Sequence, residues 1–163
     1  MLSYAVWKPG LVQSPVPTKV IGTRKDGIVY QERRAVRVLA ITPDDRVVIV
    51  KASRDNYYKL PGGGVEEGED HRVAAEREVL EETGAQVSVH TACCTTVEEY
   101  RNDLHQISYC YRATLLDEGD SSSAPELTED EVADGLSHEW VSVGKELEIM
   151  ATVEPTSELG RYI

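Results

Sequence analysis

A run of three glycines that leads into a glutamate-rich segment is the feature that most constrains this chain. The glycines are residues 62–64, and the segment from His71 to Thr83 lacks Pro and Gly and is rich in Ala, Glu, Arg and Leu. This composition is typical of an α-helix. Asp70 is expected to cap the helix at its start, and Gly84 to end it. Four aliphatic residues of the helix are predicted to face a core: Val73, Ala75, Val79 and Leu80.

Three glutamates of this helix carry the candidate chemistry. Glu78, Glu81 and Glu82 are spaced i, i+3 and i+4, so all three can project from one face. Like charges at this spacing destabilise a helix by about 0.2–0.5 kcal/mol per pair, a cost that cations would remove. Mg²⁺ and Mn²⁺ prefer carboxylate and carbonyl oxygens. Charge patterning alone still favours the plainer interpretation of a solvated helix face.

The spacing around the helix favours the metal site. Five residues separate Gly63 from Glu69, and seven more precede the pair Arg77 and Glu78. The segment resembles the Nudix box, Gly-x5-Glu-x7-Arg-Glu-U-x-Glu-Glu-x-Gly-U, where U is aliphatic. Every specified position matches, with the small Ala85 in the last aliphatic place.

The resemblance implies a fold and a set of roles. The expected fold is α/β (α+β), an α/β/α sandwich with a mixed β-sheet in which the box, residues 62–85, forms a loop–helix–loop within a single domain of residues 1–163. Arg77 would orient a box carboxylate, although a plain surface ion pair is the alternative, and Glu69 would hold the loop. The residues that the resemblance assigns to metal binding are Gly63, through its carbonyl oxygen, and Glu78, Glu81 and Glu82.

The implied reaction is water attack on phosphorus. Bound Mg²⁺, with Mn²⁺ as a substitute, would bridge the pyrophosphate oxygens and offset their charge. The general base is open: Glu131, in the segment LTEDEV, is the first candidate, with Glu98 and Glu99 as alternatives. For each of these three an exposed acid without a catalytic role is the competing interpretation.

Candidate substrate contacts surround the glycines. The backbone can approach a ligand closely at a glycine, a tyrosine ring can stack on a base, and cationic side chains can contact phosphate. Packing at the core or rim is an equally good interpretation for the tyrosines. The predicted substrate-binding residues are Lys51, Arg54, Tyr58, Gly62 and Gly64, with Arg37, Tyr57 and Tyr100 as weaker candidates.

Strand-like segments flank the box. A turn separates the Val- and Ile-rich segments 34–41 and 46–52, which predicts a hairpin. Further strands are expected at 86–97, 106–116 and 139–143, and a helix from Lys145. Residues 1–30 are expected to form an irregular N-terminal extension or an edge hairpin, and residues 117–131 an exposed acidic loop.

The composition restricts which binding partners and which cellular compartment are expected. Acidic residues outnumber basic ones 29 to 17, which argues against duplex nucleic acid, because duplex binding relies on Lys and Arg. No segment approaches the roughly 18 apolar residues of a membrane span, and the N-terminus lacks the pattern of a secretory signal. Three cysteines without C-x-x-C spacing favour a reducing environment. A cytoplasmic protein, monomeric or homodimeric, is expected.

The sequence therefore predicts a pyrophosphohydrolase that acts on a small-molecule nucleoside diphosphate derivative. The alternatives are a catalytically silent binding or sensor module of the same fold and a helical acidic domain without a metal. Nucleoside triphosphates, dinucleoside polyphosphates, nucleotide sugars, ADP-ribose and diphosphoinositols all stay open as substrates.

Overall fold

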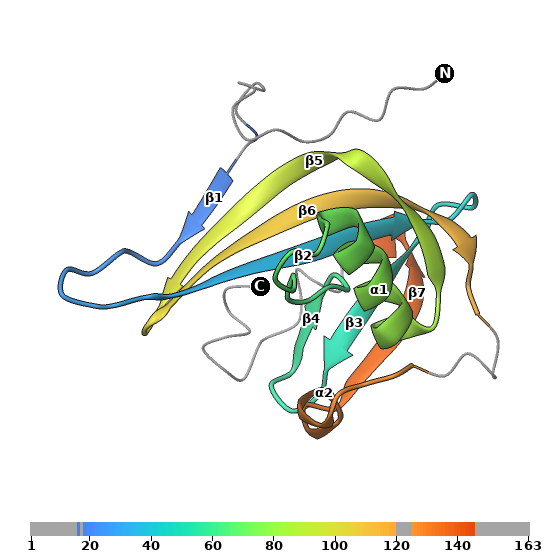
Figure 1. The fold of residues 1–163 in the computed structure, drawn as a ribbon. Helices are drawn as coiled ribbons and strands as arrows, with labels where there is room; N and C mark the ends of the chain where they lie inside the picture. The colour runs from blue at the N-terminus through green and yellow to red at the C-terminus, as the bar shows by residue number, and fades with distance from the viewer. Residues whose placement is uncertain (1–15, 17, 120–124, 146–163) are drawn as a thin grey trace, which may run out of the picture.

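Seven strands and two helices form the described part of the computed structural model, which comprises residue 16, residues 18–119 and residues 125–145. Figure 1 shows their arrangement, with one long helix lying against a strongly curved sheet. The elements are β1 (Thr18–Ile21), β2 (Gln31–Ile41), β3 (Arg46–Ala52), β4 (Tyr57–Lys59), α1 (His71–Thr83), β5 (Gln86–Arg101), β6 (Leu104–Asp117), α2 (Glu129–Ala133) and β7 (Leu136–Ser142).

The sheet is mixed, as predicted. Its order is β1-β5-β6-β2-β3-β4, and β7 pairs with β3. Two pairs are parallel, β1 with β5 and β2 with β6, and the others are antiparallel. The predicted hairpin of β2 and β3 is present, although its register joins only Ile41 to Val47. The fold is therefore α+β.

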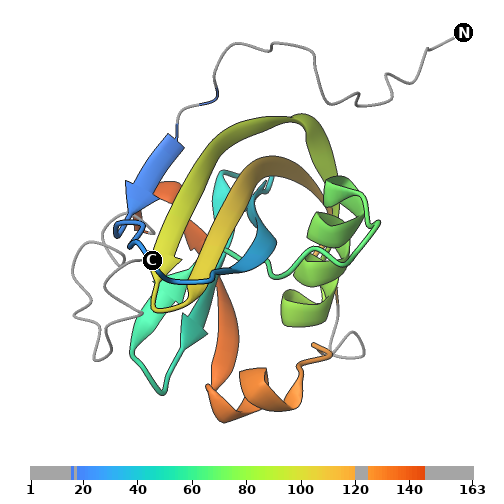
Figure 2. The same ribbon diagram turned by 60° about the vertical axis from the view of Figure 1, so that its left-hand side comes forward.

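The hairpin of β5 and β6 is longer than the sequence indicated. Both strands extend to a tight turn in which Asn102 has a φ of 52°, a conformation that Asn tolerates better than most residues. The pairing shifts register between Gln86 and Val87, between Val89 and Cys93, and between Cys93 and Thr95. Such bulges bend a strand and increase its twist, and both views show the two strands curling over the rest of the molecule (Figures 1 and 2).

Helix α1 begins and ends where predicted. The side chain of Asp70 accepts hydrogen bonds from the backbone N–H groups of Arg72, at 2.8 Å, and Val73, at 3.4 Å. Gly84 adopts the left-handed conformation with a φ of 74° and donates its N–H to the carbonyl oxygen of Leu80. Local signals at the two ends therefore set the helix bounds.

The buried face of α1 differs from the prediction at two positions. Ala75 and Val79 are fully buried in the core, but Val73 and Leu80 are 56% and 45% exposed, so their predicted burial is wrong. The face turned to the protein also carries Glu78 and Glu82, which are buried. Two carboxylates therefore take places on the helix that an ordinary amphipathic pattern would give to aliphatic residues.

Three further segments depart from the sequence-based expectations. Residues Thr18–Ile21 form an edge strand, parallel to β5, rather than a hairpin. The predicted acidic loop ends in α2, which starts with a capping box between Thr128 and Glu131, and the sequence shows its S/T-x-x-E signature. Strand β7 begins at Leu136 rather than at residue 139. Most of the helix expected from Lys145 onward lies outside the described residues.

No helix among the described residues has the length and apolarity needed to cross a membrane.

Candidate active site

The glycine-rich segment runs beside β2 and faces helix α1. The N–H of Val36 donates to the carbonyl oxygen of Gly63 at 2.9 Å, and the N–H of Val38 donates to the carbonyl oxygen of Pro61 at 2.9 Å. A Cβ on Gly62, where φ is 145°, would overlap the carbonyl oxygen of Val36, and a Cβ on Gly63 would overlap the Glu78 carboxylate. Only glycines therefore let this segment fit between the strand and the helix.

Glu82 lies at the centre of the site with a fully buried side chain. One carboxylate oxygen accepts from Nζ of Lys59 at 2.8 Å, and the other accepts from the backbone N–H of Gly62 at 2.9 Å. Sequence reasoning missed Lys59, which ends β4 and carries no spacing signal relative to the box. The ion pair gives this buried carboxylate a cationic partner.

Arg77 links the loop to the helix. Its Nε and one terminal nitrogen donate to the two oxygens of Glu69, at 2.9 and 3.0 Å. The same terminal nitrogen reaches the carbonyl oxygen of Gly64 at 3.2 Å, and the other contacts Glu78 at 2.9 Å and Glu81 at 3.2 Å. The hydrogen bond with Glu69, followed by that with Glu78, raises the pKa of Arg77 well above its ordinary value. A guanidinium with this many partners positions the box acids, which a plain surface ion pair would not do.

The surroundings of Glu78 disfavour its ionised form. Burial raises its pKa, Arg77 opposes the shift, and the charges of Glu82 and Glu81 add to it. The side chain is 10% exposed. Two buried carboxylates one helical turn apart repel each other, so a cation between them would be strongly favoured.

Glu131 of helix α2 joins this pair. One carboxylate oxygen from each of Glu78, Glu82 and Glu131 lies within 4.8 Å of the other two. Within the described ranges, the group does not include Glu81, whose side chain is 36% exposed and contacts Arg77. The structure therefore brings a residue from a distant segment to the box carboxylates and leaves one box glutamate at the rim.

A polar face of the sheet continues from these carboxylates. On β2, Val36 and Val38 point into the core beneath α1, and the alternation of a strand places Arg33 and Arg37 on the opposite face. Arg33 donates to Oε1 of Gln106 at 2.7 Å. Burial lowers the pKa of Arg37, and the charges of Glu82 and Glu78 act against that shift. Arg37 therefore lies within electrostatic reach of the buried acids.

The family assignment follows from comparison with known proteins. A model of the NUDIX domain matches residues 31–156, which include strand β2, the box, the long strands β5 and β6, and helix α2. The chain belongs to the Nudix family. The family resemblance and the mixed α+β fold expected from the sequence are thereby confirmed.

Relatives of this Nudix chain differ in what they are named for. This chain is 46% identical over 57 residues to an RNA pyrophosphohydrolase of Caulobacter vibrioides, and the match covers 33% of each protein. It is also 46% identical over 54 residues to a methanol dehydrogenase activator of Bacillus methanolicus, covering 31% of this chain and 29% of that protein. The chain thus spans about a third of the length of the curated relatives it matches.

A solved Nudix-family hydrolase from Clostridium perfringens has the same fold. The two superpose with a TM-score of 0.55 at 19% sequence identity, over 71% of this chain and 83% of the other. At this identity the likeness extends to the fold alone.

The predicted substrate-binding residues of the Nudix chain are dispersed. Arg54 forms ion pairs with Asp55 at 3.4 Å and Asp134 at 2.7 Å. The Nζ atom of Lys51 lies 5.6 Å from the ring centre of Tyr58, its partner across β3 and β4. Among the weaker predictions, Tyr57 is buried. Their roles in substrate binding stay predictions.

The alternative general bases, Glu98 and Glu99, lie near the C-terminal end of β5. Glu98 accepts from the Tyr100 hydroxyl at 2.7 Å and contacts Nε2 of His105 at 2.9 Å. These hydrogen bonds lower the pKa of Glu98, which makes it a weaker base. Oε1 of Glu99 lies 3.3 Å from Nε of Arg101. Of the three candidates, only Glu131 is grouped with the buried box acids.

Replacing Gly63 with alanine is expected to reduce activity by about 10–100-fold, the range seen when supporting contacts of a metal site are disturbed. The added methyl group must displace the Glu78 carboxylate, because that carboxylate lies where the Cβ would stand. Steady-state kinetics measure the loss. Gly68→Ala is a comparison variant: its Cβ would meet no atom within 4 Å, although its φ of 76° introduces some backbone strain. Equal activity of the Gly63→Ala variant and wild type would show that the position of Glu78 does not matter.

Proposed function

We propose that this chain is a divalent-metal-dependent pyrophosphohydrolase that cleaves the phosphoanhydride bond of a nucleoside diphosphate linked to another moiety. The observation that carries the proposal is the convergence of Glu78, Glu82 and Glu131 within 4.8 Å beside the glycine segment. Glu82 and Glu78 already pair with Lys59 and Arg77, and Glu131 adds a third carboxylate beside them, whose negative charge a divalent cation would offset.

The donor set fits a hard divalent cation. Carboxylate oxygens are the ligands that Mg²⁺ and Mn²⁺ prefer, and Mg²⁺ commonly uses one or two carboxylates together with substrate phosphates. Glu78 and Glu82 would hold the ion. Glu81, at the rim, and the carbonyl oxygen of Gly63, which also accepts from Val36, are the further ligands that the resemblance to the family assigns. Bound there, Mg²⁺ would offset the charge of the pyrophosphate oxygens and lower the pKa of a coordinated water.

The surrounding residues prepare those carboxylates. Arg77 holds Glu78 and Glu81 in orientation and ties them to Glu69 and the loop. Lys59 forms an ion pair with the buried carboxylate of Glu82. Such outer contacts fix the direction of the ligand oxygens, so that little reorganisation accompanies the reaction.

Two further residues would act on the reactants. Glu131 is our candidate for the general base that accepts a proton from the attacking water through a carboxylate oxygen. The capping box holds this side chain against the N–H and hydroxyl of Thr128, at 2.8 and 3.0 Å. Arg37, on the polar face next to Glu82, would bind a phosphate oxygen of the substrate with the donors of its guanidinium.

A substrate panel with product identification tests the function. Nucleoside triphosphates, dinucleoside polyphosphates, nucleotide sugars, ADP-ribose, diphosphoinositols and a 5′-triphosphorylated RNA oligonucleotide are incubated with Mg²⁺, with Mn²⁺ and with EDTA. We expect hydrolysis of at least one compound at a phosphoanhydride bond, and its loss in EDTA. Turnover that persists in EDTA, or no turnover of any compound with either metal, would contradict the proposal and favour a silent binding module.

A further inference from the structure

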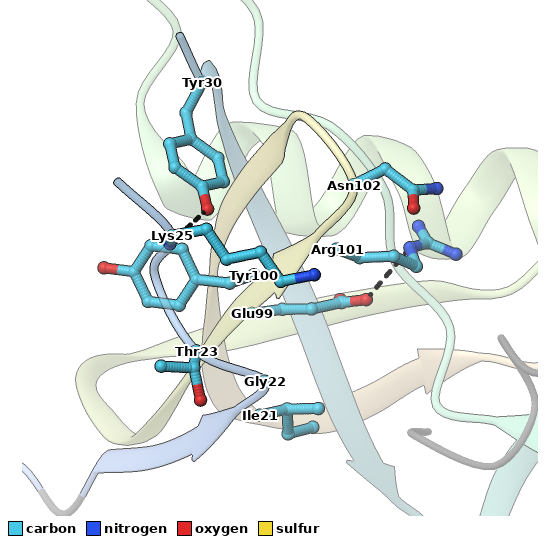
Figure 3. A pocket seen from close by; sticks show the side chains of 9 residues that line it. All are labelled: Ile21, Gly22, Thr23, Lys25, Tyr30, Glu99, Tyr100, Arg101 and Asn102. Carbon is cyan, nitrogen blue, oxygen red and sulfur yellow. Dashed lines mark hydrogen bonds and ion pairs between the residues drawn. The ribbon is translucent and has the colours of Figure 1, made fainter. Parts of the chain in front are cut away.

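A cavity of about 250 Å³ lies between the loop that follows β1 and the C-terminal end of β5. Its walls combine cationic, acidic and aromatic side chains: Lys25, Tyr30, Glu99, Tyr100 and Arg101. In Figure 3 the Glu99–Arg101 pair and the two tyrosine rings border the cavity from different sides. Ligand pockets for drug-sized molecules measure roughly 300–1,000 Å³, so this cavity suits a single ring system rather than a whole dinucleotide.

The wall of the cavity is built by a close backbone approach. Gly22, with a φ of 76°, packs so tightly against the backbone of Tyr100 that a Cβ would overlap its carbonyl oxygen. The parallel pairing of Ile21 with Glu99 holds the loop in this place. The cavity is thus formed before any ligand enters.

Glu99 supplies a polar atom without a hydrogen-bond partner. Its Oε1 is buried, and among the described residues it is the one buried side-chain N or O atom for which no hydrogen bond is formed. Nε of Arg101 lies 3.3 Å away, close enough for an ion pair but without hydrogen-bond geometry. Buried acceptors are almost always satisfied, and the exceptions require an explanation. Because this atom is closed off in the cavity, the Glu99 side chain must turn for a ligand with N–H donors to satisfy it.

The cavity adjoins the polar face that leads to the box acids. Strand register places Glu99 opposite Gln106, and Gln106 opposite Arg33. From Arg33 to Arg37 is four residues along β2, about 13 Å at 3.3 Å per residue, and the two strand spacings of about 4.8 Å each between Glu99 and Arg33 bring the separation to roughly 16 Å. An extended nucleotide can span this distance.

We propose that this cavity binds the nucleobase of the nucleotide substrate and that the pair of Glu99 and Arg101 selects guanine. The inference rests on the proposed function, because it assigns the base of the substrate to one end of the polar face and its phosphates to the other. It adds a specificity site at the edge of the sheet, outside the Nudix box.

Guanine matches the donors and acceptors of this pair. Its Watson–Crick edge carries the O6 acceptor next to two N–H donors, N1–H and N2–H₂. A carboxylate has acceptors only, and a guanidinium has donors only. Glu99 would therefore accept from N1–H and N2–H₂ while Arg101 donates to O6. Adenine offers a single amino donor next to the N1 lone pair, which a carboxylate repels. Burial makes this mismatch costly, since a desolvated acceptor stays unpaired.

Binding of GMP and AMP to the full chain in EDTA tests the proposal by calorimetry. We expect wild type to bind GMP at least about 10-fold more tightly than AMP, within the discrimination that one bidentate base contact provides. Glu99→Gln replaces an acceptor with a donor and should weaken GMP binding about 10-fold while leaving AMP within about 3-fold. Glu139→Gln, an exposed strand glutamate on β7, is the matched control and should change neither affinity.

Three results would overturn the proposal: equal affinities for GMP and AMP, no saturable GMP binding, or an unchanged affinity in Glu99→Gln. Should Glu99→Gln fail to fold, amide chemical shifts of wild type decide, because GMP must perturb Gly22, Glu99 and Arg101 most. GMP has no phosphoanhydride bond, so its binding does not depend on hydrolysis. Absence of turnover across the substrate panel would therefore refute the proposed function without removing a guanine site that these measurements had found.

Discussion

Glu82→Gln is expected to lower the turnover of a responsive diphosphate substrate by more than about 100-fold, beyond the 10–100-fold typical of outer contacts of a metal site. Glu82 is buried next to Glu78 and accepts from both Lys59 and Gly62. An amide keeps the shape but supplies one acceptor where two are used, and it removes the charge that a cation needs. Saturable Mn²⁺ binding, measured by calorimetry, should be lost together with turnover.

Two comparisons separate loss of the site from loss of the fold. Glu67→Gln changes an exposed box residue at an unspecified position, and it should retain wild-type kinetics and Mn²⁺ binding. Circular dichroism and thermal unfolding of Glu82→Gln should show a folded protein, although the ion pair with Lys59 is gone. A folded Glu82→Gln variant with wild-type turnover would refute the assignment of this residue as a metal ligand.

Val79→Asp is expected to unfold the protein. Val79 is completely buried, with 0% of its surface exposed, and it packs in the core with Ala75 and strand residues such as Val36 and Val38. Leaving an unpaired charge in such a place costs about 3–5 kcal/mol or more, a large part of the 5–15 kcal/mol by which domains are stable. Thermal unfolding monitored by circular dichroism should show no cooperative transition.

Val73→Asp on the same helix is the matched control. Val73 is 56% exposed, so the new charge stays hydrated and the midpoint of thermal unfolding should stay within a few degrees of wild type. A soluble, cooperatively unfolding Val79→Asp protein would show that α1 does not pack on the sheet through this face.

The sequence determined the helix and the box because their signals are local. The cap at Asp70, the glycine at 84 and the composition between them define a helix from nearest neighbours alone, and the observed bounds agree. The spacing of Gly63, Glu69 and Arg77 likewise indicated that they act together. In the structure Arg77 contacts Glu69, Glu78 and the carbonyl oxygen of Gly64, next to Gly63, while the functional roles of these residues stay predictions.

The faces of the helix needed the tertiary structure. From the pattern alone, Val73 and Leu80 are as good core residues as Val79, because hydrophobicity does not record which side the sheet covers. The sheet covers the side of α1 that holds Ala75 and Val79, and the glycine segment meets Glu82 on the same helix. The buried glutamates follow from that contact.

The remaining members of the site came from pairings far apart in the chain. Lys59 reaches Glu82 because β4 lies beside β3 and runs into the glycines. Glu131 reaches the same acids because α2 precedes β7, which pairs with β3. Strand register and loop closure decide such contacts, and neither leaves a periodic mark in the sequence. The local fingerprint thus identified the family, while the three-dimensional pairing decided which distant charges lie beside the box acids.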